Sequence, residues 1–293
     1  MTAPPDADGR RAPSPAETIA AIETEARQVR TPCGDGEMVW RVWGGGPPLV
    51  LLHGNFGTWM HWVRNVPVLA RRYTVIVPDT PGFGESAMPP VPCRARDIGA
   101  ILAEGLDQVV DPPRPIHLVG FSYGGRLAGE VARIMGDRLA SLTLVAPGGL
   151  GVEDAPWPEL AKLRPRMTRE DIVSVHRHNL AAMMIADPAE VDDLAVYIQH
   201  KNTRRARFRL THWPDEDVWE SLARALPEVA VPVQGIWSTR DAFAGDTLGR
   251  RLAVVRAAQP DADIRMMDGV GHWMFYEDAE TFNGLLLEIL GPR

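Results

Sequence analysis

A five-residue motif, GFSYG at positions 120–124, most constrains how this chain can fold. It follows an apolar run at residues 116–119, which predicts a buried strand, and precedes residues 126–135, which predict a helix. Glycines at both sides of the turn let strand and helix pack closely. The turn forces Ser122 into a strained backbone conformation. Its hydroxyl is therefore expected at the carboxyl end of a sheet, above a helix N-terminus that stabilises negative charge.

The composition is that of an ordinary soluble protein, with 45% hydrophobic and 24% charged residues in 293. A net charge of -7 argues against a nucleic-acid-binding surface. Cys33 and Cys93 form no CxxC pair, so we expect neither a metal site nor a redox motif. Whether they pair stays open, although a reduced cytoplasmic protein is the simpler interpretation. No apolar run approaches the ~18 residues of a membrane span, so no membrane association is expected.

The order of strand and helix patterns predicts an α/β protein with a doubly wound, mostly parallel sheet. Patterns alternate through residues 31–147 and resume over 228–293, which together form the predicted core. Residues 148–227 contain helical patterns and no convincing buried strand. We interpret them as a helical cap, inserted after the sixth strand and covering the carboxyl edge of the sheet. Residues 1–30 are expected to form a disordered or helical tail.

Several local signals predict where particular elements begin. Helices are expected over 15–29 and 58–71, and an antiparallel edge strand over 38–43. In the cap, Thr168 and Asp171 resemble a capping box that starts one helix. A second helix is expected to start at Asp187 and Pro188, and a third to cover 217–225.

Ser122 needs an adjacent base to act as a nucleophile at neutral pH. His272 follows the last predicted strand and precedes the last helix, so its loop opens at the same sheet edge. Asp241 lies just past the predicted strand 233–237, where a carboxylate can hold the imidazole in the correct tautomer. The order Ser122, Asp241, His272 is the hydrolase order. Asp154 and Asp246 stay open as weaker candidates for the acid.

An anionic intermediate requires at least two hydrogen-bond donors aimed at it. The backbone N–H of Tyr123 directly follows the nucleophile, and the second donor is expected to be the N–H of Asn55. His53 is expected to fix the loop that carries Asn55. His61 could edge the pocket, but its position on the first core helix favours a surface or packing role.

Several motifs resemble those of the α/β-hydrolase superfamily, over residues 35–293. Within it, the chain is similar to the meta-cleavage product hydrolases, which cut a carbon–carbon bond in vinylogous diketo acids from aromatic ring breakdown. The segment GHWMFYEDAETFNGLLLEIL, residues 271–290, carries the strongest similarity. The matching motifs are HGNFG (53–57), DTPGFGES (79–86), GFSYGG (120–125), STRD (238–241) and GHW (271–273).

The resemblance implies a cofactor-free hydrolase that cleaves a small carbonyl substrate through an acyl-enzyme or gem-diol mechanism. Phe56, Phe121 and Trp273 are the expected substrate contacts, and Arg204 and Arg205 the cap arginines for a substrate carboxylate. Phe121 departs from the group, which usually has asparagine just before the nucleophile. The resemblance therefore leaves ester and C–C bond substrates both open.

Two other functions are compatible with the same scaffold. One is a small-ligand-binding protein with little turnover, although binding alone does not require an intact triad. The other is a cofactor-free perhydrolase or haloperoxidase, whose members usually lack a large cap. Enzymes with a carboxylate nucleophile are disfavoured because the turn carries Ser122. The exposed cap surface is compatible with a homodimer.

Overall fold

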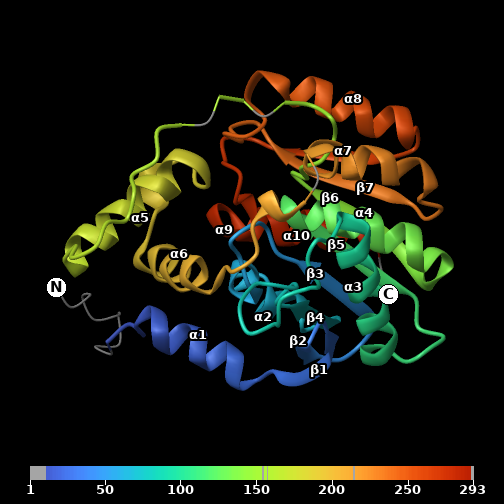
Figure 1. The fold of residues 1–293 in the computed structure, drawn as a ribbon, viewed down its shortest axis with the longest axis horizontal. Helices are drawn as coiled ribbons and strands as arrows, with labels where there is room; N and C mark the ends of the chain where they lie inside the picture. Colours follow the sequence, from blue (N-terminus) through green and yellow to red (C-terminus); the bar gives the residue numbers. More distant parts are fainter. Residues whose placement is uncertain (1–10, 154, 157, 214, 292–293) are drawn as a thin grey trace.

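A computed structural model describes residues 11–291 except 154, 157 and 214. In this part of the chain the core is an eight-stranded sheet with the strand order β1-β2-β4-β3-β5-β6-β7-β8 (Figure 1). The strand β2 is antiparallel to β1 and β4, and all other neighbouring pairs are parallel. The strands are β1 (Arg27–Cys33), β2 (Gly36–Gly44), β3 (Pro48–Leu52), β4 (Thr74–Pro78), β5 (Ile116–Phe121), β6 (Leu139–Val145), β7 (Val233–Ser238) and β8 (Asp263–Met267).

Helices cover the sheet in two groups, as expected for a doubly wound fold. In one group α3, α4, α7 and α8 pack in a row; in the other α2, α9 and α10 pack together. The helices α5 and α6 contact each other beside the core (Figure 1). The helices are α1 (Pro15–Thr24), α2 (Val66–Leu69), α3 (Ala95–Val109), α4 (Tyr123–Met135), α5 (Arg169–Met183), α6 (Asp193–Arg205), α7 (Asp215–Ala225), α8 (Leu248–Ala258), α9 (Met274–Glu277) and α10 (Ala279–Ile289). No described helix is long and apolar enough to cross a bilayer.

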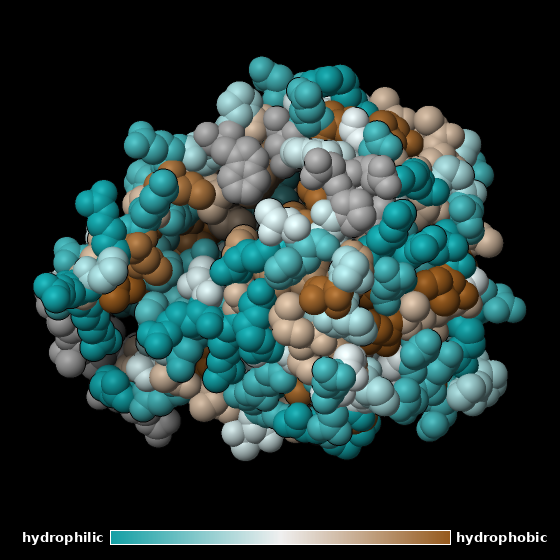
Figure 2. Space-filling view, in the orientation of Figure 1, coloured by the Kyte–Doolittle hydropathy of each residue, from teal (hydrophilic) through white to brown (hydrophobic). Residues whose placement is uncertain are grey.

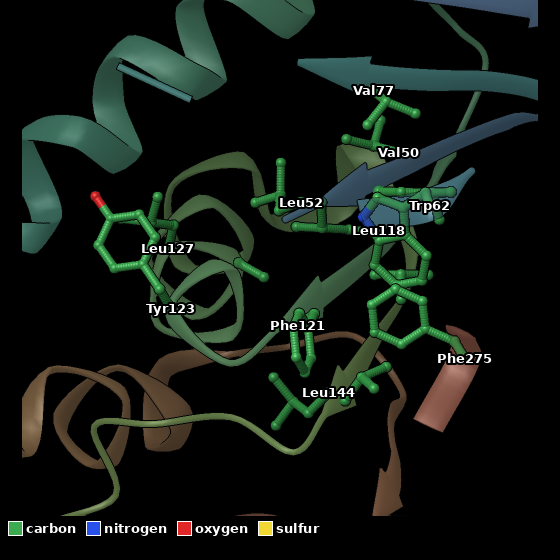
Figure 3. Close-up of a cluster of buried hydrophobic side chains, with 14 of the residues drawn as sticks. Val50, Leu52, Trp62, Val77, Leu118, Phe121, Tyr123, Leu127, Leu144 and Phe275 are labelled. Atoms are coloured by element: carbon green, nitrogen blue, oxygen red, sulfur yellow. The ribbon is translucent and has the colours of Figure 1, made fainter. Parts of the chain in front are cut away.

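The centre of the sheet is a buried apolar layer beneath the GFSYG turn. All five residues of β3 are buried, because β3 lies between β4 and β5 and is covered on both faces. Figure 3 shows Trp62 and Phe275 stacked within this layer, with ring centroids 3.9 Å apart. Phe121 lies next to Phe275, so the residue before Ser122 is part of the core. On the outside, hydrophilic side chains cover most of the face in Figure 2, with apolar ones scattered between them.

The turn between β5 and α4 is strained, as the motif predicts. Ser122 has φ 52° and ψ -112°, a conformation that side-chain-bearing residues rarely adopt. Its N–H donates to the Val145 carbonyl at 3.0 Å. Its own carbonyl accepts from the N–H groups of Gly125 at 3.0 Å and Gly148 at 3.2 Å. These bonds tie the strained residue to β6 and α4, so the surrounding structure holds it in place.

The flanking glycines make this close approach possible. A Cβ on Gly120 would lie 2.5 Å from the Gly124 carbonyl oxygen and 2.6 Å from the Ala128 Cβ. A Cβ on Gly124 would lie 2.6 Å from the carbonyl oxygens of Leu52 and His53. Neither contact can be relieved without moving backbone.

The N-terminal part differs from the expectation in two ways. The helix α1 ends at Thr24, and residues 27–33 form β1 instead of continuing the helix or a tail. The strand 38–43 is consequently covered by β1 and is not the edge. A tight turn with Gly34 at φ +55° lets β1 pair with β2, and Trp40 Nε1 donates to Thr31 Oγ1 at 2.8 Å. Pairing of the two strands across this hairpin overrides local helical spacing.

The predicted helix over 58–71 is also wrong as one element. It consists of a 3₁₀ turn at Trp59–Trp62 and the short helix α2. Pro67 explains the break, because proline cannot donate the hydrogen bond that a helix interior requires and clashes with the preceding turn.

The cap helices follow the signals in part. Thr168 and Asp171 form the predicted capping box at the start of α5. Asp187 caps only a 3₁₀ turn, Pro188–Glu190, and α6 begins later with Asp192 as its N-cap. The helix α7 packs against α3 and α4, with the core helices and not with α5 and α6.

Replacing Gly120 with alanine should destabilise the protein by ~3 kcal/mol, because the new methyl group overpacks the β5–α4 junction. Gly284 is a matched control: it lies in α10 with nothing within 4 Å of an added Cβ. Gly284→Ala should stabilise the helix by roughly 0.5–1 kcal/mol. Urea unfolding of both variants measures the difference, and equal stabilities would contradict the packing argument.

Candidate active site

A cavity of about 270 Å³ lies at the carboxyl ends of the parallel strands. All three residues of the predicted triad line it, although they come from different parts of the chain. Ser122 follows β5, Asp241 follows β7, and His272 follows β8. The fold therefore brings the three side chains to one place, as their positions after strand ends predicted.

Asp241 and His272 form a short, buried hydrogen bond. His272 Nδ1 lies 2.8 Å from Asp241 Oδ2, and both residues are 4% exposed. The other oxygen, Asp241 Oδ1, accepts from the Phe243 N–H at 2.8 Å. With Nδ1 protonated and bound to the carboxylate, the His272 Nε2 is left as the basic nitrogen.

The pKa of Asp241 is below its usual value despite burial. Burial raises this pKa, but the His272 imidazole and the N–H groups of Phe243 and Ala244 outweigh it. The carboxylate stays ionised and can stabilise a positive imidazolium on His272.

Two aromatic rings hold the His272 imidazole from its sides. The ring centroids of Phe121 and Phe243 lie 4.8 Å and 4.5 Å from that of the imidazole. Phe121 also lines the cavity, as does Phe56. Phe121 therefore contributes an apolar wall and supports the histidine.

The predicted oxyanion donors belong to two segments that meet at the cavity. Asn55 and Tyr123 both line it. The Asn55 side chain accepts from the Phe56 N–H at 3.0 Å, and the Tyr123 ring stacks on Trp213 in the interior. These contacts involve the side chains, and the backbone N–H groups of the two residues stay the predicted donors.

His53 fixes the loop, as expected. Its Nδ1 donates to the Gly54 carbonyl at 2.8 Å, and its Nε2 accepts from the Thr80 N–H at 3.0 Å. The ring is fully buried, and burial lowers its pKa, so it remains neutral.

His61 lines the cavity wall, which was the less favoured expectation for this residue, and its ring also packs against Phe121 and Trp273. It is 2% exposed, and no described residue pairs with its Nδ1. Burial, followed by the nearby His53 and His272, lowers its pKa well below the usual value. Gly57 provides the room: a Cβ there would lie 2.4 Å from the His61 Cε1. Helical spacing alone could not show that the ring points to a cavity.

Only some of the expected substrate contacts line the cavity: Phe56 and Phe121 do, whereas the other three residues do not. Arg204 and Arg205 are exposed at the end of α6 and do not line the cavity, and Arg205 faces Glu85 at 3.4 Å. Trp273 is fully buried behind the wall, where its Nε1 donates to the His61 carbonyl at 3.1 Å.

Two other arginines line the cavity, Arg126 and Arg251. Arg126 lies one helical turn after Ser122 and donates to the Val218 carbonyl. Arg251 donates to Thr247 Oγ1 at 2.9 Å and to the Phe243 carbonyl at 3.1 Å. Position i+4 after the nucleophile is a signal that could have drawn attention to Arg126.

The other candidates from the sequence do not join the site. Asp246 lies in a 3₁₀ turn before α8 and does not line the cavity, and Asp154 falls outside the described residues. Cys33 and Cys93 are buried free thiols. Within the described ranges no cluster of three or more metal-ligating side chains occurs.

Comparison with known proteins decides the family. A model of the "Alpha/beta hydrolase family" matches residues 49–285. The chain belongs to the α/β hydrolase family. It is a hydrolase, and the curated relatives that it matches over most of their length are named as hydrolases. A 2-hydroxy-6-oxo-6-phenylhexa-2,4-dienoate hydrolase of Burkholderia cepacia is 29% identical over 88% of both chains. A 2-hydroxy-6-oxononadienedioate/2-hydroxy-6-oxononatrienedioate hydrolase of Pseudomonas putida is 30% identical, over 84% of this chain and 88% of its own.

Solved structures share the fold at lower identity. The carboxylesterase CesB from Bacillus subtilis superposes with a TM-score of 0.75 at 14% identity, covering 94% of this chain and 95% of its own. The meta-cleavage product hydrolase CumD superposes with a TM-score of 0.71 at 19% identity, covering 89% and 97%. A carboxylesterase and a meta-cleavage product hydrolase thus share the fold of this chain.

Stability should fall as the pH drops below about 6.5, because unfolding lets the neutral, buried His61 take up a proton. The unfolded chain then binds more protons than the folded chain, so protonation favours unfolding. In His61→Leu, unfolding no longer exposes this titratable imidazole. The free energy of unfolding should therefore fall less steeply between pH 6 and pH 5, by about 1.4 kcal/mol per pH unit. Urea unfolding at several pH values measures the slope, and an unchanged slope would contradict the burial argument.

Proposed function

We propose that the protein is a serine hydrolase with Ser122 as nucleophile, His272 as general base and Asp241 as the residue that orients the base. One observation carries this proposal: the buried Asp241–His272 hydrogen bond lies in the same cavity as the strained Ser122. Neither a binding protein nor a packing role requires this combination of a fixed tautomer and a strained hydroxyl.

The reaction follows from these positions. The His272 Nε2 removes the Ser122 proton as Oγ attacks a substrate carbonyl. The N–H groups of Asn55 and Tyr123 stabilise the resulting oxyanion, a contribution of about 3 kcal/mol per donor. The intermediate collapses, and His272 gives its proton to the leaving group. A water molecule, deprotonated by His272, then attacks the acyl-enzyme and releases the acid and free Ser122.

The substrate should be a small molecule with an apolar acyl part. Most of the cavity wall is apolar, and polar side chains form the smaller part of it. Such a wall favours hydrocarbon or aryl groups next to the reacting carbonyl. The apolar lining includes Phe56, Leu160, Met183, Leu210, Val218 and Phe243.

Carbon–carbon bond cleavage is a second candidate within the same mechanism. The curated relatives named above act, by their names, on dienoate and dienedioate substrates. A vinylogous diketone can release a carbon leaving group because the conjugated system accepts the electron pair, and His272 or water then protonates it. The carboxylate of such a substrate needs a cation, and Arg126 and Arg251 line the cavity. Phe121 stands where the relatives' group usually has asparagine, so an ester substrate remains an equal candidate.

Ser122 should react with a fluorophosphonate probe in the folded protein, because His272 activates its hydroxyl. Ser122→Ala should abolish both labelling and ester turnover.

Asp241→Asn should keep the fold but lower kcat by about 10⁴-fold, since the amide favours the wrong imidazole tautomer. Intact-mass spectrometry and nitrophenyl ester kinetics measure these changes. Equal labelling of the parent and Ser122→Ala would refute the assignment.

A substrate panel should distinguish the two bond types. The panel compares kcat/KM for p-nitrophenyl esters of increasing chain length with kcat/KM for a chemically prepared 2-hydroxy-6-oxo-dienoic acid. If the carboxylate is held by a guanidinium, Arg126→Gln should lower kcat/KM for the dienoic acid by about 10-fold or more and spare neutral esters. Turnover of the esters alone would assign the protein to the esterases.

A further inference from the structure

One segment of the cap lies directly against the loop that carries His272. This segment, residues 184–187, connects α5 to the next turn and is called the cap connection below. The Trp273 N–H donates to the Met184 carbonyl at 2.7 Å. Gly271 has no side chain to separate the two: a Cβ there would lie 2.7 Å from the Ala186 nitrogen and 2.8 Å from the Met184 oxygen.

The Glu277 carboxylate joins these two segments. It lies at the end of α9, the short red helix on the side of the core that faces α5 and α6 (Figure 1). Its Oε2 accepts from the N–H groups of Gly271 at 2.7 Å and Ala186 at 2.9 Å. Its Oε1 accepts from the Asp187 N–H at 2.9 Å. Hydrogen bonds to an ionised acceptor are stronger than neutral ones, so these three form a firm junction.

We propose that Glu277 is a positioning residue for the reaction, which holds the His272 loop and the cap connection as one unit. This inference rests on the proposed role of His272. Gly271 directly precedes His272, and its carbonyl accepts from Ser238 Oγ at 2.7 Å while its N–H is held by Glu277. Both peptide groups that flank Gly271, the residue before His272, are therefore held by side chains.

The same junction reaches the substrate cavity. Met183 and Met184 line the cavity. Met184 is also the residue whose carbonyl accepts from Trp273, next to His272. A substrate packed against this wall thus contacts the segment that Glu277 ties to the base. Glu277 keeps the distance between the substrate wall and the imidazole constant.

The test variant is Glu277→Gln. The amide keeps one acceptor oxygen, but its NH₂ group is a donor and faces at least one backbone N–H. Two donors cannot bind each other, so at least one hydrogen bond of the junction is lost. A displacement of the base by ~1 Å should lower kcat by about 10²-fold. KM for a short ester should change only a few-fold. Labelling of Ser122 by a small fluorophosphonate should slow by the same factor as kcat, because it needs the base but few cap contacts.

Asp192→Asn is the matched control. Asp192 also ties the cap to the core, through Arg64 Nη2 at 2.6 Å and the Tyr276 hydroxyl at 2.6 Å. It contacts neither Gly271 nor the cap connection in the hydrogen bonds described. Loosening this tie should lower Tm and leave the labelling rate at the parental value. Both variants are assayed well below their melting temperatures, measured by circular dichroism.

The proposal is overturned if Glu277→Gln lowers Tm but labels at the parental rate, since that is the behaviour of a purely structural residue. If Glu277→Gln does not fold, Gly271→Ala disturbs the same junction from the other side, and a parental labelling rate there overturns the proposal. His272→Ala separates this inference from the proposed function. Loss of activity in His272→Ala with full activity in Glu277→Gln rejects the positioning role alone, whereas full activity in His272→Ala rejects both.

Discussion

The close approach of β5 and α4 around Ser122 is the constraint on which the rest of the structure depends. Backbone atoms of β3, β5 and α4 come so near one another that Gly120 and Gly124 have no space for a methyl group. This contact fixes Ser122 at φ 52° and turns it towards the cavity. The cost of such a strained residue is of order 1–3 kcal/mol and must be offset by the surrounding sheet. The buried apolar layer beneath the turn supplies that support.

The cavity combines burial with a controlled set of charges. Asp241 keeps its negative charge although it is almost fully buried, because the His272 imidazole and two backbone N–H groups bind it. His53 and His61 are kept neutral by burial, so they add hydrogen-bonding groups without adding charge. A low-dielectric site of this kind strengthens the interaction between Asp241 and a transient imidazolium.

Local signals identified the elements whose formation depends on neighbouring residues. The capping box at Thr168 and the strand before the GFSYG motif are examples, and both are found at the expected residues. The failures lie where the same apolar spacing is compatible with more than one element. Residues 27–33 became a strand because they pair with β2, and Pro67 divided a segment whose apolar spacing resembled one helix. The expected helix start at Asp187 moved to Asp192, because the intervening residues form a separate 3₁₀ turn.

The sequence by itself determined the fold class and predicted that Ser122, Asp241 and His272 meet at one place, because parallel strands carry the residues after their carboxyl ends to a common edge. Chain order and strand position are properties that one sequence displays directly. Only the tertiary structure decided that His61 and Arg126 face the cavity, that Arg204 and Arg205 do not, and that Glu277 ties the cap to the His272 loop. The direction of a helical side chain and the meeting of segments far apart in sequence depend on how the layers pack. That packing is set by the sum of many contacts, so no local pattern specifies it.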